Sequence, residues 1–264
     1  MLDTGNVLNS EVYQYHDMNY SLVMDSLNLM EYRAINLGNW DLYSSSSFVE
    51  KACSNNNTIP LISANVTSLK AQESCIQKYI IREINGIKIG ITGIIPQQSS
   101  FRPPDKRFPI IDPAAALNDI IPDLDKNSDF IVLLSQLPAI ATQEMVKNFP
   151  DIDLALCADS IPTDLESLST HRVMTIVGQG KQIGVVSIEK DQQNTTIKES
   201  RTILLGNNID SDPAIQNLIS DYYKKIELQR EKKKEIEIAK EEKKLLQLTP
   251  EEFIKQYNNE RKKK

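Results

Sequence analysis

Histidine is scarce in this sequence of 264 residues, which holds only His16 and His171. Imidazole is the commonest transition-metal ligand and the commonest general base in proteins. Two histidines so far apart in the sequence therefore exclude any mechanism that needs a cluster of them. Long apolar runs are missing as well. No stretch of 18 apolar residues occurs, so we expect no membrane-spanning helix.

Cysteine is almost as scarce, with Cys53, Cys75 and Cys157 and no CxxC pair. An odd number of cysteines cannot form a complete disulfide framework. Scattered thiols suit a reducing compartment or small residues in the core, and we favour the core. The first residues lack the basic and apolar regions of a signal peptide. We therefore expect a cytoplasmic protein, or a periplasmic one if an upstream signal peptide has been lost.

Acidic residues exceed basic ones, and the net charge is −6. A chain with this balance is not a nucleic-acid binder by bulk electrostatics, so we expect no specific nucleic-acid partner. The charge is unevenly placed: residues 224–264 hold 14 Lys and Arg against 9 Asp and Glu, which leaves 16 against 27 in residues 1–223. Apolar residues are sparse near the C-terminus. We predict a globular domain over 1–208 and a helical extension over 209–264.

Short β-branched runs alternate with amphipathic stretches in the first 208 residues, which predicts an α/β domain. Helices are expected over 18–30, 112–124 and 139–148, and strands over 34–37, 59–64, 79–94, 130–135, 152–156, 174–177, 183–188 and 197–205. Because only strands are expected from residue 173 onward, the pattern predicts a mixed sheet with an antiparallel C-terminal part.

Three local patterns are more specific than the rest. The pair Asn85-Gly86 between alternating apolar runs predicts a type I′ turn, which makes 79–94 a hairpin. The apolar run 130–135 is typical of a central strand that is covered on both faces. Asp112-Pro113 predicts the N-cap and the first residue of a helix.

The extension opens on a second such pair, Asp212-Pro213, and continues without a helix breaker to Leu248. Residues 249–252 then form the pattern of a capping box for a last short helix. An apolar stripe runs over 215–226. It does not continue beyond that range, where charged residues lie on every face of the expected helix. This pattern suits either a solvated single helix or a helix that binds a protein partner, and both remain open.

Two apparent motifs are set aside on physical grounds. The glycine-containing segment 178–184 fits no phosphate-loop spacing, and strands flank it on both sides, so we expect a tight turn there. Ser135 and Ser160 have no histidine in their sequence context to activate them. The sequence therefore does not support a hydrolase triad.

Polar residues stand at the C-terminal ends of expected strands, in segments 3–6, 38–41, 135–136 and 158–160. In α/β sheets these strand ends converge on one crevice, where sites are usually assembled. The same residue types also end strands in ordinary turns. From the pattern alone, both interpretations stay open.

The order of these segments resembles the calcineurin-like metallophosphoesterases, and within them the catalytic domain of the 5′-nucleotidase family. That family reads DxGD, then GN[HD] with an acidic residue after it, an ANV strand, a KIG hairpin, a strand ending in SH, and GHxH. The matching segments here are 3–6, 38–41, 63–66, 86–94, 129–136, 153–160 and the strand pair 173–188. The resemblance covers about residues 1–205. It implies a four-layer αββα sandwich, which here carries a long C-terminal helical extension.

The resemblance also implies two divalent metals that generate hydroxide to attack a phosphate ester. The family-equivalent positions in this sequence are Asn6, Asn39, Trp40, Asp41, Gln136 and Asp159. Asn6 replaces the bridging aspartate, Trp40 replaces the histidine that would protonate the leaving group, and Gln136 replaces a histidine ligand. Asn39, itself a ligand in the family, is kept, whereas 158–161 lacks both histidines of GHxH. The DxH strand of the family would precede Met1.

The donors left at these positions, Asn6, Asn39, Gln136 and Asp159, carry one negative charge. We expect at most one weakly bound, oxygen-ligated cation and no dinuclear metal centre. The leading hypothesis is therefore a degenerate, catalytically inactive phosphoesterase-like protein that needs no cofactor. It would act as a structural or binding subunit, with a protein partner on the C-terminal helix.

The alternative is an active, divergent metal-dependent phosphoesterase that hydrolyses nucleotides or related phosphomonoesters. In that case the oxygen ligands would favour Mg²⁺, Mn²⁺ or Ca²⁺. A third hypothesis is a sensor that binds a nucleotide without hydrolysing it.

Overall fold

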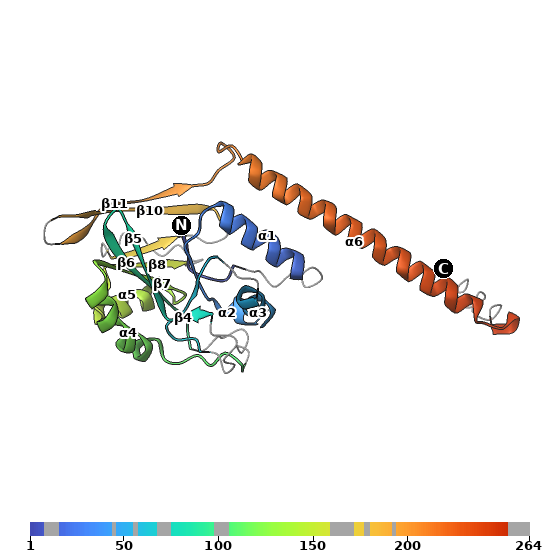
Figure 1. Ribbon diagram of the computed structural model, residues 1–264, viewed down its shortest axis with the longest axis horizontal. Coiled ribbons are helices and arrows are strands. Elements are labelled where there is room, and N and C mark those ends of the chain that lie inside the picture. The colour runs from blue at the N-terminus through green and yellow to red at the C-terminus, as the bar shows by residue number, and fades with distance from the viewer. Residues whose placement is uncertain are drawn as a thin grey trace. The chain divides into compact units, whose positions relative to one another are not determined.

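The computed structural model describes residues 1–7, 16–43, 46–54, 58–67, 75–97, 106–158, 172–176, 180–191 and 194–252. The chain divides into two compact units, Met1–Ser211 and Asp212–Lys264. Within the described residues, the first unit contains every strand and the second contains one long helix (Figure 1).

Four short parallel strands form the first sheet. They are β1 (Leu2–Asp3), β2 (Ala34–Asn36), β3 (Leu61–Ile62) and β4 (Ile76–Gln77), in that order across the sheet. The strands predicted over 34–37 and 59–64 are confirmed, with shorter bounds. Parallel neighbours need a crossover, and between β1 and β3 the chain crosses over through α1 (His16–Leu29), α2 (Asn39–Tyr43) and α3 (Ser46–Ser54).

The second sheet is mixed and has the order β5-β6-β7-β8-β9. Its strands are β5 (Tyr79–Ile84), β6 (Ile87–Ile94), β7 (Phe130–Ser135), β8 (Leu154–Ala158) and β9 (Val173–Ile176). Strands β5 and β6 are antiparallel and joined at Asn85 and Gly86, whose φ angles of 51° and 79° confirm the predicted turn. Strand β7 is buried at every position, as its apolar run predicts.

The prediction for the C-terminal strands was wrong in two respects. Strand β9 pairs parallel with β8, and the 14 residues between the two strands are enough for the crossover that a parallel pair needs. Strands β10 (Gln182–Lys190) and β11 (Thr195–Leu204) form a separate two-stranded antiparallel sheet instead of extending the mixed one. A four-residue connection permits only the antiparallel return.

Helices cover the outer faces of both main sheets. Helices α1–α3 lie against the first sheet, and α4 (Pro113–Asn127) and α5 (Ala139–Asn148) lie against the second (Figure 1). As predicted, α4 begins at Pro113, and Asp112 caps it by accepting a hydrogen bond from the backbone N–H of Ala115.

Three apolar clusters fill the spaces between these four layers. Because successive side chains of a strand face opposite sides, Ile35 joins the cluster under α1–α3, whereas Ala34 joins the cluster between the sheets. In the same way Ile131 faces α4 and α5, and Val132 faces the first sheet. The predicted four-layer αββα sandwich is therefore confirmed.

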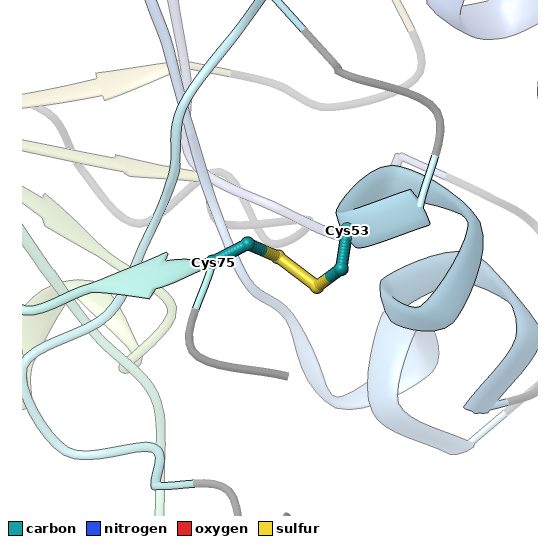
Figure 2. The surroundings of a disulfide bond; sticks show 2 residues. All are labelled: Cys53 and Cys75. Carbon is teal, nitrogen blue, oxygen red and sulfur yellow. A yellow bond between two sulfur atoms is a disulfide. The ribbon is translucent and has the colours of Figure 1, made fainter. Parts of the chain in front are cut away.

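A disulfide joins Cys53 in α3 to Cys75 just before β4, with their Cα atoms 5.4 Å apart (Figure 2). Cys157 lies outside this pair and is fully buried in β8. The prediction of scattered thiols in the core holds for Cys157 and was wrong for the other two. The two cysteines are 22 residues apart in the sequence, so their pairing could not be predicted without knowing that the fold brings α3 and β4 together.

The second unit contains α6 (Pro213–Leu246), whose 34 residues span about 51 Å at 1.5 Å per residue. Asp212 caps it by accepting hydrogen bonds from the N–H groups of Ala214 and Ile215, as its sequence predicts. Thr249 and Glu252 make the reciprocal hydrogen bonds of a capping box. Among the described residues, no helix is long and apolar enough to cross a membrane.

Candidate functional site

Two polar side chains from opposite sheets meet at the carboxyl ends of the strands. Asn6 follows β1 in the first sheet, and Gln136 follows β7 in the second. The Nδ2 of Asn6 donates a hydrogen bond of 2.6 Å to the Oε1 of Gln136, across 130 residues of sequence. These two family-equivalent positions are therefore in direct contact, and the contact joins the two sheets at the carboxyl ends of β1 and β7, a place called the crevice below.

The remaining polar atoms of this amide pair are bonded too. The Oδ1 of Asn6 accepts a 2.9 Å hydrogen bond from the backbone N–H of Trp40, and the Nε2 of Gln136 donates one of 2.7 Å to the carbonyl of Thr4. Each amide therefore has both its oxygen and its nitrogen engaged by protein groups. These hydrogen bonds fix the orientation of both amides, although each amide oxygen keeps a second lone pair.

The buried carboxyl group of Asp41 fixes two loops of the crevice through hydrogen bonds to their backbone. Its side chain is fully buried, and its Oδ2 accepts hydrogen bonds of 2.8 Å from the backbone N–H groups of both Gly38 and Asn6. A β-carbon at Gly38 would lie 2.1 Å from the Oδ1 of Asn6, so only glycine fits there. The carboxylate of Asp41 thus positions the loop after β1 against the start of α2.

Asn39 and Trp40 begin α2 beside this amide pair. The Oδ1 of Asn39 is buried and has no hydrogen-bond partner among the described residues. A buried amide oxygen without a partner costs free energy, and the Oδ1 of Asn36 on β2 is also buried without one among the described residues. The side chain of Trp40 is 37% exposed, next to Asn6.

Several sequence candidates lie outside the residues that the structure describes. Asp159, the only acid of the expected ligand set, is among them, as are Ser160 and His171. His16 begins α1, but its side chain is also outside the described part. Their positions relative to Asn6 and Gln136 stay predictions.

Asn36, which sequence reasoning missed, lies on β2 directly behind the crevice. Its side chain is fully buried, and its Nδ2 lies 3.0 Å from the carbonyl of Thr4 and 3.2 Å from those of Ile94 and Leu134. Asn36 thereby ties the first sheet to β6 and β7. The available signal was its position two residues after Ala34, which puts a polar group on the inner face of a buried strand.

Asn65 performs a similar structural task on the other side of β6. Its Nδ2 donates to the carbonyls of Ile95 and Ile111, and its Oδ1 accepts a hydrogen bond from the N–H of Ile95. The ANV segment that resembles the family therefore fixes the chain after β6. The amide of Asn65 is fully buried, so its role is structural.

Ser135 is sealed in the core at the end of β7. Its Oγ lies 2.8 Å from the Oγ1 of Thr142 and accepts a hydrogen bond from the N–H of Leu137. This hydroxyl positions the turn between β7 and α5. A nucleophile would have to be accessible, and Ser135 is not.

One carboxyl near the crevice has a shifted pKa. Burial raises the pKa of Asp3 above its ordinary value, and a hydrogen bond of 2.8 Å from the N–H of Gly5 opposes the increase. Asp3 turns towards its own loop through this bond. It shapes the entry to Asn6 and is not part of the amide contact.

The described residues do not fit the two divalent metals of catalytic phosphoesterases. Two such cations need several anionic or imidazole donors, and no group of three or more His, Cys, Asp or Glu that could hold a metal occurs among the described residues. Asn6 and Gln136 bond to each other, and the Oδ2 of Asp41 accepts from two backbone groups. Of the family-equivalent positions in the described part of the chain, Asn39 alone keeps a buried oxygen without a partner.

The solved structures that resemble this chain include a phosphoesterase and nucleotidases. The calcineurin-like phosphoesterase YfkN from Bacillus subtilis matches with a TM-score of 0.65 and 18% identity over 85% of this chain and 82% of its own. The 5′-nucleotidase precursor from Thermus thermophilus gives 0.66 and 16% over 86% and 49%. The NAD nucleotidase NadN of Haemophilus influenzae gives 0.67 and 18% over 85% and 50%. The chain spans about half the length of these two nucleotidases.

No protein-family profile matches the chain, and no curated protein matches it in sequence. At identities below one in five, the likeness to solved structures concerns the fold alone. The chain therefore has the fold of the calcineurin-like phosphoesterases and 5′-nucleotidases. The resemblance drawn from the sequence is confirmed at that level, and the activity is a separate question.

Proposed function

We propose that this protein is a non-catalytic member of the metallophosphoesterase fold, which acts as a structural or binding subunit. The observation that carries the proposal is that the polar side chains of the crevice hydrogen-bond to each other and to the backbone. Asn6 and Gln136 stand where the family has a metal-bridging aspartate and a histidine, and their amides bind each other and the backbone.

The chemistry of phosphate-ester hydrolysis supports this proposal. A metal-dependent phosphoesterase needs a cation to polarise the ester and to generate hydroxide at neutral pH. The amides of Asn6 and Gln136 are neutral, and the carboxylate of Asp41 is buried under two backbone N–H groups. These groups instead fix two loops and the two sheets to each other.

A second candidate function, a divergent metal-dependent phosphoesterase, has one observation in its favour. The buried Oδ1 of Asn39 has no hydrogen-bond partner among the described residues. It could accept a hydrogen bond from a ligand or bind one hard cation that prefers oxygen ligands. With Asp159 as an anionic donor, such a site would hold a single Mg²⁺, Mn²⁺ or Ca²⁺. The substrates would be nucleotides or related phosphomonoesters.

The two candidates separate in a phosphatase assay of the full chain. We would measure release of inorganic phosphate from AMP and p-nitrophenyl phosphate with each of the three cations, beside an Asn39→Ala variant purified in the same way. The non-catalytic proposal expects both proteins to release phosphate at one background rate. Turnover by the native chain that the Asn39→Ala variant loses would contradict it, whereas equal turnover by both would indicate a contaminating phosphatase.

The proposed binding role rests on α6. Apolar side chains stay exposed along the charged part of this helix, where Leu228 is 52% exposed and both Ile236 and Ile238 are 56% exposed. Exposed apolar side chains on a charged helix can be buried by a protein partner, which supports a binding role for α6.

A photo-crosslinking amino acid placed at position 236 or 238 of the full chain tests this role in the cells that make the protein. We expect a discrete adduct of one size from either position. The matched control carries the same group at Lys198 on β11 and should give no such adduct. An absence of adducts from both helix positions would favour the solvated single helix.

A further inference from the structure

The Cys53–Cys75 disulfide joins two elements that are too small to be stable alone. Cys53 lies near the end of α3, a helix of nine residues, and Cys75 directly precedes β4, an edge strand of two residues (Figure 2). Strand β4 pairs with β3 at Leu61 and Ile62. A strand this short contributes few ladder hydrogen bonds, so the disulfide adds a covalent link where pairing is weak.

Packing brings these two sulfur atoms together. Both cysteines are half-buried and lie against the apolar cluster that contains Phe48 and Val49 of α3. Their Cα separation of 5.4 Å is inside the range of about 4.4 to 6.8 Å that a disulfide requires. Folding of the sandwich therefore presents the two thiols to each other without a movement of the backbone.

The third cysteine is placed where it cannot exchange with this pair. Cys157 is fully buried in β8, in the second sheet, and its Sγ lies 3.4 Å from the Oγ1 of Thr175. It belongs to a different apolar cluster from Cys53 and Cys75. The odd number of cysteines therefore corresponds to one specific bond and one core thiol.

From this arrangement we infer that the chain completes its fold by forming the Cys53–Cys75 bond in an oxidising compartment, and that it works outside the reducing cytosol. Structural disulfides persist in secreted and periplasmic proteins and are rare where glutathione keeps thiols reduced. The bond between α3 and β4 also braces the helical layer that contains α2, on which Asn39, Trp40 and Asp41 lie.

The oxidation needs a disulfide-containing oxidant, for example oxidised glutathione. One thiolate of the pair attacks a sulfur of the oxidant and releases a first glutathione thiolate. The second protein thiolate then attacks the mixed disulfide and releases the second glutathione. In total, two cysteine thiols lose two protons and two electrons, and one oxidant disulfide becomes two thiols.

Alkylation in the cells that make the protein tests the inference directly. Intact cells are treated with N-ethylmaleimide, and the chain is then isolated in denaturant with the reagent still present and its mass is measured. We expect one adduct, at Cys157, on a chain that is lighter by two hydrogen atoms, and three adducts when reductant precedes the reagent. Three adducts without reductant would overturn the inference.

A second measurement asks whether the bond stabilises the fold. For a loop of this length, the loss of the cross-link should lower the urea midpoint of unfolding by on the order of 1 M. We expect that loss on addition of dithiothreitol and in a Cys53→Ser/Cys75→Ser variant, which dithiothreitol should not affect further. The control Cys157→Ser keeps the response to dithiothreitol.

Each outcome of this second test decides the question. A double variant that fails to fold while Cys157→Ser folds normally supports a structural bond. Equal midpoints for the oxidised, reduced and double-variant chains would show that the bond contributes nothing to the fold, which would contradict the inference.

Discussion

Two pairs of amide side chains, one in the interior and one at the crevice, differ in what they stabilise. Asn36 and Asn65 are fully buried and bind backbone groups around β6, which fixes the two sheets and the chain that follows. Asn6 and Gln136 lie at the open end of the same sandwich and bind each other. Burial decides how much an amide contributes to stability, whereas its position at a strand end decides whether it could have bound a ligand.

The crevice is more exposed than the interior, but its polar side chains are likewise hydrogen-bonded to one another and to the backbone. In both places neutral amides satisfy backbone groups, and Asp41 does the same with a buried carboxylate. The chief exception among the described residues of the crevice is the unbonded Oδ1 of Asn39. Substitutions at matched positions in the two regions should therefore differ in their effect on stability.

The largest effect is expected from Asn36→Asp. The ionised carboxylate cannot donate to the carbonyls of Thr4, Ile94 and Leu134, and it would be a buried charge among acceptors. We expect the free energy of unfolding to fall by about 4 kcal/mol at pH 7, measured by urea denaturation. The loss should shrink in acid, where the neutral carboxyl can donate. A loss below about 1 kcal/mol would remove Asn36 as the link between the sheets.

A smaller loss is expected from Asn65→Ala. This change leaves a buried N–H and two carbonyls without their partner, and an unsatisfied buried group costs about 1–3 kcal/mol. We expect a fall of about 3 kcal/mol in the free energy of unfolding. The matched control at the crevice is Gln136→Ala, which should cost under about 1 kcal/mol because water can replace its bonds. Equal losses for the two variants would erase the difference between interior and crevice.

Asp3→Asn tests how the raised pKa of the Asp3 carboxyl affects the stability of the fold. Because burial raises the pKa of Asp3 in the folded chain above the unfolded value of about 3.9, its ionised form opposes folding at pH 7. That cost disappears as the pH falls through the raised pKa towards about 3.9. The variant, whose amide oxygen can still accept from Gly5, should have the higher urea midpoint at pH 7, with an advantage that vanishes at acid pH. A constant advantage across this range would exclude a titrating Asp3 as the cause.

The smallest effect is expected from Asn6→Asp, the same chemical change as Asn36→Asp at an exposed site. A carboxylate can still accept from the N–H of Trp40, and the Gln136 amide can turn to donate to it. We expect the free energy of unfolding to change by less than about 0.5 kcal/mol, measured in the same urea titration. A loss as large as that of Asn36→Asp would show that the crevice is part of the core.

The local features of the fold could be predicted from the sequence because short-range chemistry determines them. The turn at Asn85-Gly86 follows from positive φ angles, the cap at Asp112 from an orphan N–H, and the burial of β7 from its apolar run. Of the polar residues at strand ends, Asn6 and Gln136 are in contact, whereas Asp159 lies outside the described residues.

Features that depend on contacts between distant segments could not be predicted. The Asn6–Gln136 bond spans 130 residues, and the bonds of Asn36 reach across the space between the sheets. The pairing of Cys53 with Cys75 depends on a helix and a strand that the sheet brings together. No periodicity or local spacing encodes which of these groups become partners.

The proposed non-catalytic role requires that the hydrogen-bonded crevice hold no dinuclear metal centre. The most direct measurement is the metal content of the full chain after it has been equilibrated with excess Mn²⁺ and passed over a desalting column. Elemental mass spectrometry should find far less than one Mn²⁺ per chain. Two Mn²⁺ retained per chain would contradict the account.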